Sequence, residues 1–174
     1  MVFTFPKDPD NRNLKNLLSW KDKLVIDCQR ANLMNRIRDE VWFRSRLLTY
    51  MELSSEPVLT EDGKAMLPKG TKITFYTVQN REGMRFFPVF TDREELDRWE
   101  MKGDARPRTV LVTFDDLMPV LRANAAFEGI VINPMSDNLL LLKSAIEDWT
   151  KQKAFIMKQL REQQEKMNRS AEEK

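Results

Sequence analysis

Residues 84–99 read MRFFPVFTDREELDRW and place a strand directly before a helix. The first half is rich in aromatic residues, which favour an extended strand. Pro88 has no amide hydrogen to give to a neighbouring strand, so it indicates a sheet edge or the end of regular pairing. Thr91 is followed three residues later by Glu94, a capping-box pattern that predicts a helix over 92–101. The stretch therefore places strand and helix together in one α+β unit.

Further strands and helices are predicted on both sides of this junction. The segment 71–79 (TKITFYTVQ) is β-branched and aromatic, and the turn at 80–83 predicts a hairpin with the strand that follows it. Thr113 with Asp116 is a second capping pattern, and it predicts a helix over 114–124. Other apolar strand segments are expected at 48–53, 109–113, 128–133 and 138–142. We therefore expect an α+β fold with a single mixed or antiparallel sheet of about five to six strands and flanking helices.

Long helices are expected at both ends of the chain. Apolar residues recur at three- and four-residue steps between Leu14 and Val41, which predicts one helix over about 14–47. If this helix breaks, we expect the break near its weak helix formers Asn32 and Asn35. A last helix is expected from the capping pattern at Ser144 to Lys174. The chain then divides into a helical segment (1–46), an α+β domain (47–150) and a charged helical extension (151–174).

Composition excludes several classes of function. Histidine is absent, which rules out Ser-His-Asp and Cys-His nucleophile sites and histidine-bearing zinc sites. Cys28 is the one cysteine, so an intrachain disulfide and a cysteine metal cluster are excluded. The 29 basic and 27 acidic residues nearly balance, and this does not demand a nucleic acid or a membrane as partner. No signal peptide or membrane-spanning run is present, so we expect a cytoplasmic protein without a cofactor.

A succession of patterns resembles the SseB amino-terminal domain, the domain of the "enhanced serine sensitivity" protein and not the secretion translocator of the same short name. Residues 87–92 (FPVFTD) are similar to the family's P-x-F-T element, and Leu96 and Trp99 to the helix that follows it. Residues 113–117 (TFDDL) are similar to the next helix start, and 129–134 (GIVINP) to its hydrophobic strand ending in Asn-Pro. The resemblance implies a compact α+β fold and brings no established catalytic residue.

The basic face near the end of the amino-terminal helix is the first candidate surface. It combines basic and aromatic side chains, a composition typical of surfaces that bind acidic partners or nucleic acid and of interface hot spots. The residues are Arg36, Arg38, Trp42, Phe43, Arg44 and Arg46. Two interpretations stay open: Trp42 forms part of an exposed interface, or it packs in the core while the arginines are solvated.

Two further candidate surfaces lie elsewhere. On the last helix, Trp149, Ile156 and Leu160 share one face, which suits a partner-binding or self-associating helix as well as a solvated tail. The strand ends predict a pocket edge, or plain strand ends and turns, at Pro88, Thr91, Asn133 and Pro134. The adjacent carboxylates Asp115 and Asp116 lie in the first turn of a helix, where acids favour the helix dipole. We interpret that pair as structural rather than catalytic.

The leading hypothesis is a non-catalytic protein-interaction module that binds another protein or a second copy of itself. A sensor of a small ligand, such as an amino acid or a nucleotide, is the alternative suggested by the predicted pocket edge. Nucleic-acid binding through the basic helix is a third, which the near-zero net charge disfavours.

Overall fold

The structure is a computed structural model, and it describes residues 8–59, 65–66, 68–99 and 107–172. The helices of these ranges are α1 (Arg12–Leu18), α2 (Asp27–Phe43), α3 (Arg93–Asp97), α4 (Phe114–Ala123) and α5 (Lys143–Glu172). The strands are β1 (Leu47–Leu53), β2 (Val58–Leu59), β3 (Ala65–Met66), β4 (Ile73–Phe75), β5 (Val78–Gln79), β6 (Arg85–Val89), β7 (Arg108–Val112), β8 (Phe127–Ile132) and β9 (Leu139–Leu142). The predicted α+β class is confirmed.

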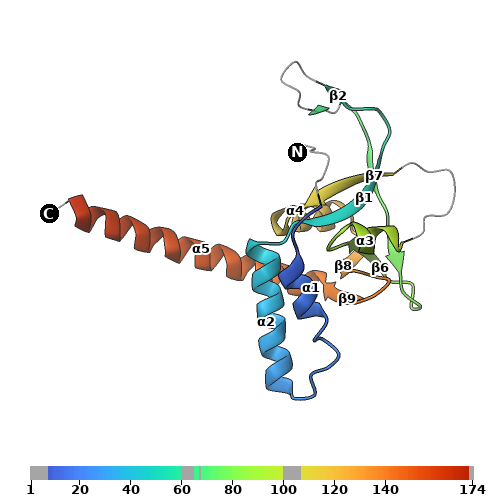
Figure 1. The fold of residues 1–174 in the computed structure, drawn as a ribbon. Coiled ribbons are helices and arrows are strands. Elements are labelled where there is room, and N and C mark those ends of the chain that lie inside the picture. The colour runs from blue at the N-terminus through green and yellow to red at the C-terminus, as the bar shows by residue number, and fades with distance from the viewer. Residues whose placement is uncertain (1–7, 60–64, 67, 100–106, 173–174) are drawn as a thin grey trace.

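The expectation of a single sheet is wrong. The described strands form a three-stranded sheet in the order β4-β1-β7, a four-stranded sheet in the order β5-β6-β8-β9, and a separate β2-β3 ribbon (Figure 1). The two larger sheets meet at one bridge, in which Leu48 and Phe90 exchange backbone hydrogen bonds of 2.8 Å. The predicted hairpin is correspondingly divided: β5 pairs with β6, whereas β4 turns away to pair with β1.

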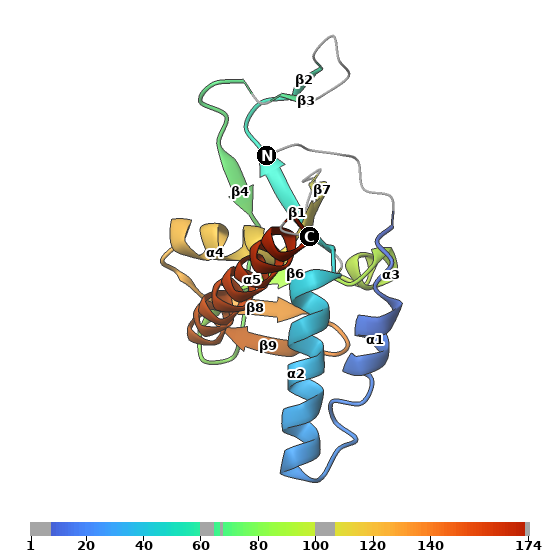
Figure 2. The ribbon, with the colours of Figure 1, turned by 90° about the vertical axis from the view of Figure 1, so that its left-hand side faces the viewer.

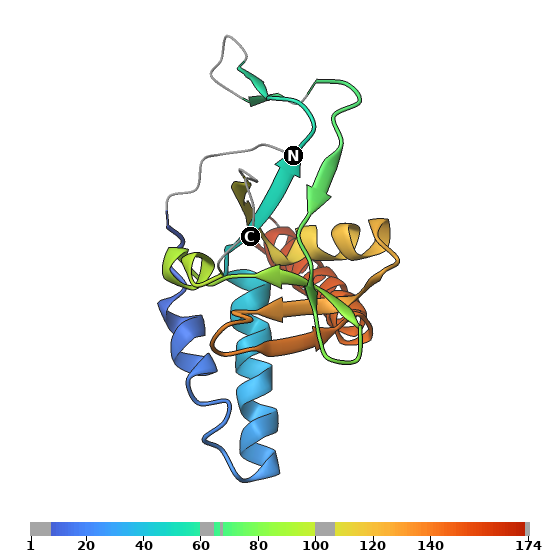
Figure 3. The same cartoon turned by 90° about the vertical axis from the view of Figure 1, so that its right-hand side faces the viewer.

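The four-stranded sheet has a mixed pairing pattern. β6 runs parallel to β8, with Pro88 opposite Val131, and β8 runs antiparallel to β9. The pairing of β5 with β6 reaches no further than Phe86, so the missing amide of Pro88 interrupts no pairing on that side. Figure 3 shows β8 and β9 side by side with α2 crossing behind them.

The prediction of one long amino-terminal helix is also wrong. The chain leaves the helix after Leu18 and re-enters one at Asp27, so α1 and α2 lie side by side and antiparallel (Figure 2). Both helices place leucines in the same buried cluster as the four-stranded sheet, which contains Ile130 and Leu141. The amino-terminal helices therefore pack on the α+β domain rather than projecting from it.

The helix starts agree with the sequence in one case and differ in another. The capping box of Thr113 and Asp116 at the start of α4 is confirmed. At α3 the expected cap Thr91 is wrong, because the side chain of Asp92 accepts the hydrogen bond from the amide of Glu95. Residues 98–99 lie beyond the end of this short helix, and the rest of the predicted range, 100–101, lies outside the described residues.

The predicted long carboxy-terminal helix is confirmed as α5, which has 30 residues. Its first turns contact β8, β9 and α4, where Ile146 is fully buried. Beyond the middle of its length α5 leaves the body of the molecule and projects from it (Figure 1). Among the residues that the structure describes, no helix has the length and apolar character needed to cross a membrane.

Candidate functional site

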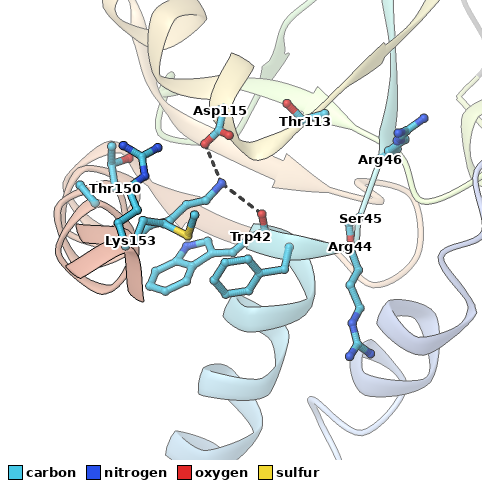
Figure 4. A pocket seen from close by; sticks show the side chains of 12 residues that line it. Trp42, Arg44, Ser45, Arg46, Thr113, Asp115, Thr150 and Lys153 are labelled. Atoms are coloured by element: carbon cyan, nitrogen blue, oxygen red, sulfur yellow. Dashed lines mark hydrogen bonds and ion pairs between the residues drawn. The ribbon is translucent and has the colours of Figure 1, made fainter. Parts of the chain in front are cut away.

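A pocket of about 610 Å³ lies where the end of α2, the start of α4 and the middle of α5 come together (Figure 4). α2 ends at Phe43 and β1 begins at Leu47. The three residues between them, Arg44, Ser45 and Arg46, line the pocket. The lining residues are Trp42, Phe43, Arg44, Ser45, Arg46, Thr113, Asp115, Thr150, Lys153, Ala154, Met157 and Arg161. The pocket thus collects four of the six residues predicted for the basic helix face.

Lys153 ties the three helices of the pocket together. Its Nζ atom lies 2.7 Å from a carboxylate oxygen of Asp115 on α4 and donates a hydrogen bond of 3.2 Å to the backbone oxygen of Trp42 (Figure 4). The same ammonium group lies 5.4 Å from the ring centre of Phe114 and 5.8 Å from that of Phe43. Its positive charge is therefore already balanced within the protein.

Two buried donors in the pocket have no acceptor. Trp42 is 4% exposed and Ser45 is 6% exposed. Neither the Trp42 Nε1 atom nor the Ser45 Oγ atom has a hydrogen-bond partner among the described residues. Buried polar atoms are normally paired, and an unpaired one costs about 1–3 kcal/mol. Two residues that line the pocket therefore carry unpaired polar atoms that are themselves shielded from solvent.

Three arginines surround the pocket with positive charge that is poorly balanced. Arg44 has a distant ion pair of 3.7 Å with Glu40. Arg46 and Arg161 have no carboxylate partner in the described parts of the chain. Figure 4 shows the side chains of Arg44 and Arg46 pointing in opposite directions. They line a broad opening rather than converging on one small centre.

A second pocket of about 560 Å³ adjoins the first between α1 and α2. The two share Phe43 and Arg44, and the second also contains Arg36. Three of the four arginines predicted for one face of the helix, Arg36, Arg44 and Arg46, are therefore distributed over the two neighbouring pockets, which share the half-exposed Phe43.

The remaining helix residues have structural contacts. The guanidinium of Arg38 stacks over the indole of Trp42 at 4.7 Å and forms an ion pair of 2.9 Å with Asp39. Trp42 itself is in the core cluster, so its ring is not an exposed anchor, and only its Nε1 edge is unsatisfied. On α5, Trp149 packs partly buried against the same cluster. Ile156 and Leu160 are 38% and 52% exposed.

The residues of the predicted pocket edge form a buried hydrogen-bond cluster. Asn133 Oδ1 accepts from the Thr91 amide at 2.9 Å, and Asn133 Nδ2 donates to Thr91 Oγ1 at 3.0 Å and to Asp137 at 2.8 Å. Thr49 Oγ1 donates to the carbonyl of Pro88 at 2.8 Å. The four predicted residues, Pro88, Thr91, Asn133 and Pro134, line neither of the two pockets described above. The hydrogen bonds of Pro88, Thr91 and Asn133 hold the strand ends in place.

Asp92 extends this cluster toward α1. Burial alone would raise the pKa of the Asp92 carboxyl, but hydrogen bonds from Lys15, the Glu95 amide and Thr91 lower it below its usual value. The hydrogen bond to Asp92 in turn raises the pKa of Lys15, and the two groups are 2.8 Å apart. The side chain of Asn11 completes the cluster by donating to the backbone oxygens of Arg46 and Thr91.

Several residues of the candidate pocket were not predicted from the sequence. They come from the start of α4, from α5 or from the turn after α2. They are Ser45, Thr113, Asp115, Thr150, Lys153, Ala154, Met157 and Arg161. One sequence signal existed: Lys153 interrupts the apolar face of α5, and a lysine in such a position needs a partner when it is buried. Within the described ranges, no group of three or more His, Cys, Asp or Glu side chains is placed to hold a metal ion.

Fold and pocket together define a small α+β domain with a projecting helix and a basic pocket at the base of that helix. The model of the SseB protein N-terminal domain matches residues 44–148, and the chain belongs to this family. The matched range begins at the turn after α2 and ends in the first turns of α5, so α1, α2 and the projecting part of α5 lie outside it. No curated protein and no solved structure matches the chain.

Proposed function

We propose that the chain is a non-catalytic protein-interaction module that binds a partner protein along α5. The observation that carries this proposal is the exposure of large apolar side chains on the projecting part of the helix. These are Phe155, Ile156, Met157, Leu160 and Met167, which are between 37% and 73% exposed. Apolar side chains clustered on one element are typical of interaction sites, whereas isolated ones are ordinary.

The stripe on α5 supports this proposal through its continuity. Ile146 and Trp149 pack against the core, and the same helical face continues through Lys153 to Ile156 and Leu160 at three- and four-residue steps. The body of the molecule covers the first part of this face and leaves the second part uncovered. An amphipathic helix in this situation binds its apolar face to a groove or a helix of another chain.

The test is a quantitative capture from native lysate with the intact chain and the double variant Ile156→Ser/Leu160→Ser. Both side chains are exposed, so we expect the variant to fold with an unchanged melting temperature and to lose the captured partner. The matched control is Leu140→Ser/Leu142→Ser on β9, where the two leucines are 44% and 51% exposed. Partner loss in the control pair alone would move the binding surface to β9 and refute docking along α5.

Sensing of a small ligand is the second candidate function, favoured by the volume of the pocket and its two unpaired donors. A thermal-shift screen of amino acids and nucleotides tests it. A stabilised melting temperature that is abolished in Ser45→Ala supports this candidate, and no stabilisation by any compound argues against it.

A further inference from the structure

We propose that the basic pocket binds the carboxylates of an acidic, amphipathic segment of a partner protein, whose apolar side chains lie along α5. This inference rests on the proposed function, because it assigns a chemistry to the partner of the same surface.

The first argument is charge. Arg44, Arg46 and Arg161 line the pocket, and the carboxylate of Asp115 is already paired with Lys153 at 2.7 Å. The guanidinium groups of Arg46 and Arg161 lack a carboxylate among the described residues, and the Arg44 pair with Glu40 is long at 3.7 Å. A guanidinium binds a carboxylate through two parallel hydrogen bonds, which makes an acidic side chain a fitting ligand. Because Arg44 and Arg46 point apart, they suit several carboxylates spread along a segment better than one small anion.

The second argument is that the unmatched groups at the pocket share one polarity. Trp42 Nε1 and the arginine guanidinium groups can only donate hydrogen bonds, and Ser45 Oγ can also donate. The Trp42 and Ser45 atoms are buried and unpaired, even though both residues line an open pocket. Of these groups, the guanidinium groups of Arg44, Arg46 and Arg161 belong to exposed residues, so a ligand that binds them must supply oxygen acceptors, as carboxylates and backbone carbonyls of a polypeptide do.

The third argument is the apolar surface that continues from the pocket. Met157 lines the pocket and is 37% exposed, and Leu160 follows it by three residues on α5. Phe43, at 53% exposure, also lines the pocket. The ligand therefore needs apolar side chains beside its carboxylates.

The probe is a synthetic, fluorescein-labelled amphipathic helix with leucines on one face and glutamates on the other. A control peptide carries glutamine in place of every glutamate. Fluorescence anisotropy with the full chain measures binding of each peptide at low and high salt. We expect the acidic peptide to bind, its affinity to fall with added salt, and the glutamine peptide to bind about tenfold more weakly or not at all.

Variants place the binding in the pocket. Arg46→Ala and Arg161→Ala are each expected to weaken binding of the acidic peptide by about tenfold, because each removes one guanidinium–carboxylate contact. Arg122→Ala is the matched control, since Arg122 is an exposed arginine on α4 that does not line the pocket. Equal affinity for both peptides, or equal weakening by Arg122→Ala, overturns the proposal.

The indole resonance of Trp42 gives a direct readout in ¹H–¹⁵N spectra of the labelled full chain, assigned with Trp42→Phe. We expect this resonance to move when the acidic peptide is added and to stay in place with the glutamine peptide. An unmoved resonance in the presence of bound acidic peptide overturns the proposal, and so does a DNA duplex that displaces the peptide.

Lysate capture that depends on Leu160 while the acidic peptide fails to bind would refute this inference and leave the proposed function standing. Peptide binding without any dependence of capture on Leu160 would refute the proposed docking along α5 and leave only the binding of carboxylates at the basic pocket.

Discussion

The carboxamide of Asn133 joins the end of β8 to the segment that leads into α3. Asn133 is buried, its Oδ1 accepts from the Thr91 amide, and its Nδ2 donates to Thr91 Oγ1 and to Asp137. Its φ of 49° lies in the left-handed region, which asparagine adopts more readily than most residues. The residue therefore combines a backbone role with a side-chain role, which explains an asparagine at this strand end without a ligand.

Replacing Asn133 by alanine removes these hydrogen bonds and leaves the Thr91 amide unpaired in a buried site. We expect Asn133→Ala to lower the free energy of unfolding by about 1–3 kcal/mol. Urea unfolding at neutral pH measures it, with Asn32→Ala on the exposed face of α2 as the control. A change no larger than that of the control would show that the cluster does not stabilise the fold.

Asp92 predicts a dependence of stability on pH. Because the pKa of its carboxyl is lowered in the folded protein, the unfolded chain binds a proton more readily. The stability that Asp92 supplies is thus complete above its ordinary pKa of 3.8 and is lost as the pH falls through the lower folded value. We expect Asp92→Asn to be less stable than the parent at neutral pH and the difference to shrink in acid. Urea unfolding between pH 7 and pH 3, with exposed Asp22→Asn as control, measures it; a difference that stays constant with pH contradicts the assignment.

At the scale of elements, the sequence predicts most strands, but it misses the break between α1 and α2 and extends the ends of α2 and α3 too far along the chain. β1, β7, β8 and β9 lie within one or two residues of their expected ranges, because each is a short apolar run between clear turns. A break was expected near Asn32 or Asn35, but α2 is continuous through both residues, and the chain leaves the helix at 19–26 instead. This break escaped prediction because neither glycine nor proline marks it and the leucine spacing continues on both sides. Cys28 and Ala31 lie within the apolar repeat between Leu14 and Val41 that predicted one long helix, but both are exposed in the structure.

Only the lining residues near the end of α2 were singled out from the sequence, and they were predicted as an interaction surface rather than as a pocket. Helical periodicity shows which residues share a face, but it cannot show that α4 and α5 pass beside the end of α2. The Lys153–Asp115 pair joins residues 38 positions apart, and no local pattern encodes it. Likewise, the division into two sheets depends on where β1 finds its partners, which alternation along a strand does not specify.

The pairing of β8 with β9 depends on a glycine. An added Cβ at Gly129 would lie 2.1 Å from the backbone oxygen of Leu141, a contact that only movement of β9 can relieve. We expect Gly129→Ala to cost about 3 kcal/mol or more in the free energy of unfolding, because the clash is with backbone rather than with a flexible side chain. Glu128→Ala on the exposed side of the same strand is the control. Urea unfolding of both variants decides; equal stability would contradict the close approach of the two strands.

At the scale of the whole molecule, one hydrophobic cluster holds α1, α2, α4 and α5 and the four-stranded sheet together, whereas Leu96 of α3 lies in a smaller second cluster. Leu14 of α1, Ile37 of α2, Leu117 of α4 and Ile146 of α5 are buried in the cluster that contains Phe87 of β6. α5 belongs to this core only through its first turns and carries its apolar side chains outward beyond them. The fold thus presents one rigid helix whose base adjoins the basic pocket, an arrangement suited to docking another polypeptide.

The most direct test of the interaction function is site-specific photo-crosslinking in native cells, with a photoreactive amino acid at Leu160. We expect a discrete adduct with one partner protein, because this side chain is half exposed on the apolar face of α5. The same group at Glu128, which is exposed on β8, is the control and should give no such adduct. An adduct at Glu128 but none at Leu160, or none at either position, would contradict docking along α5.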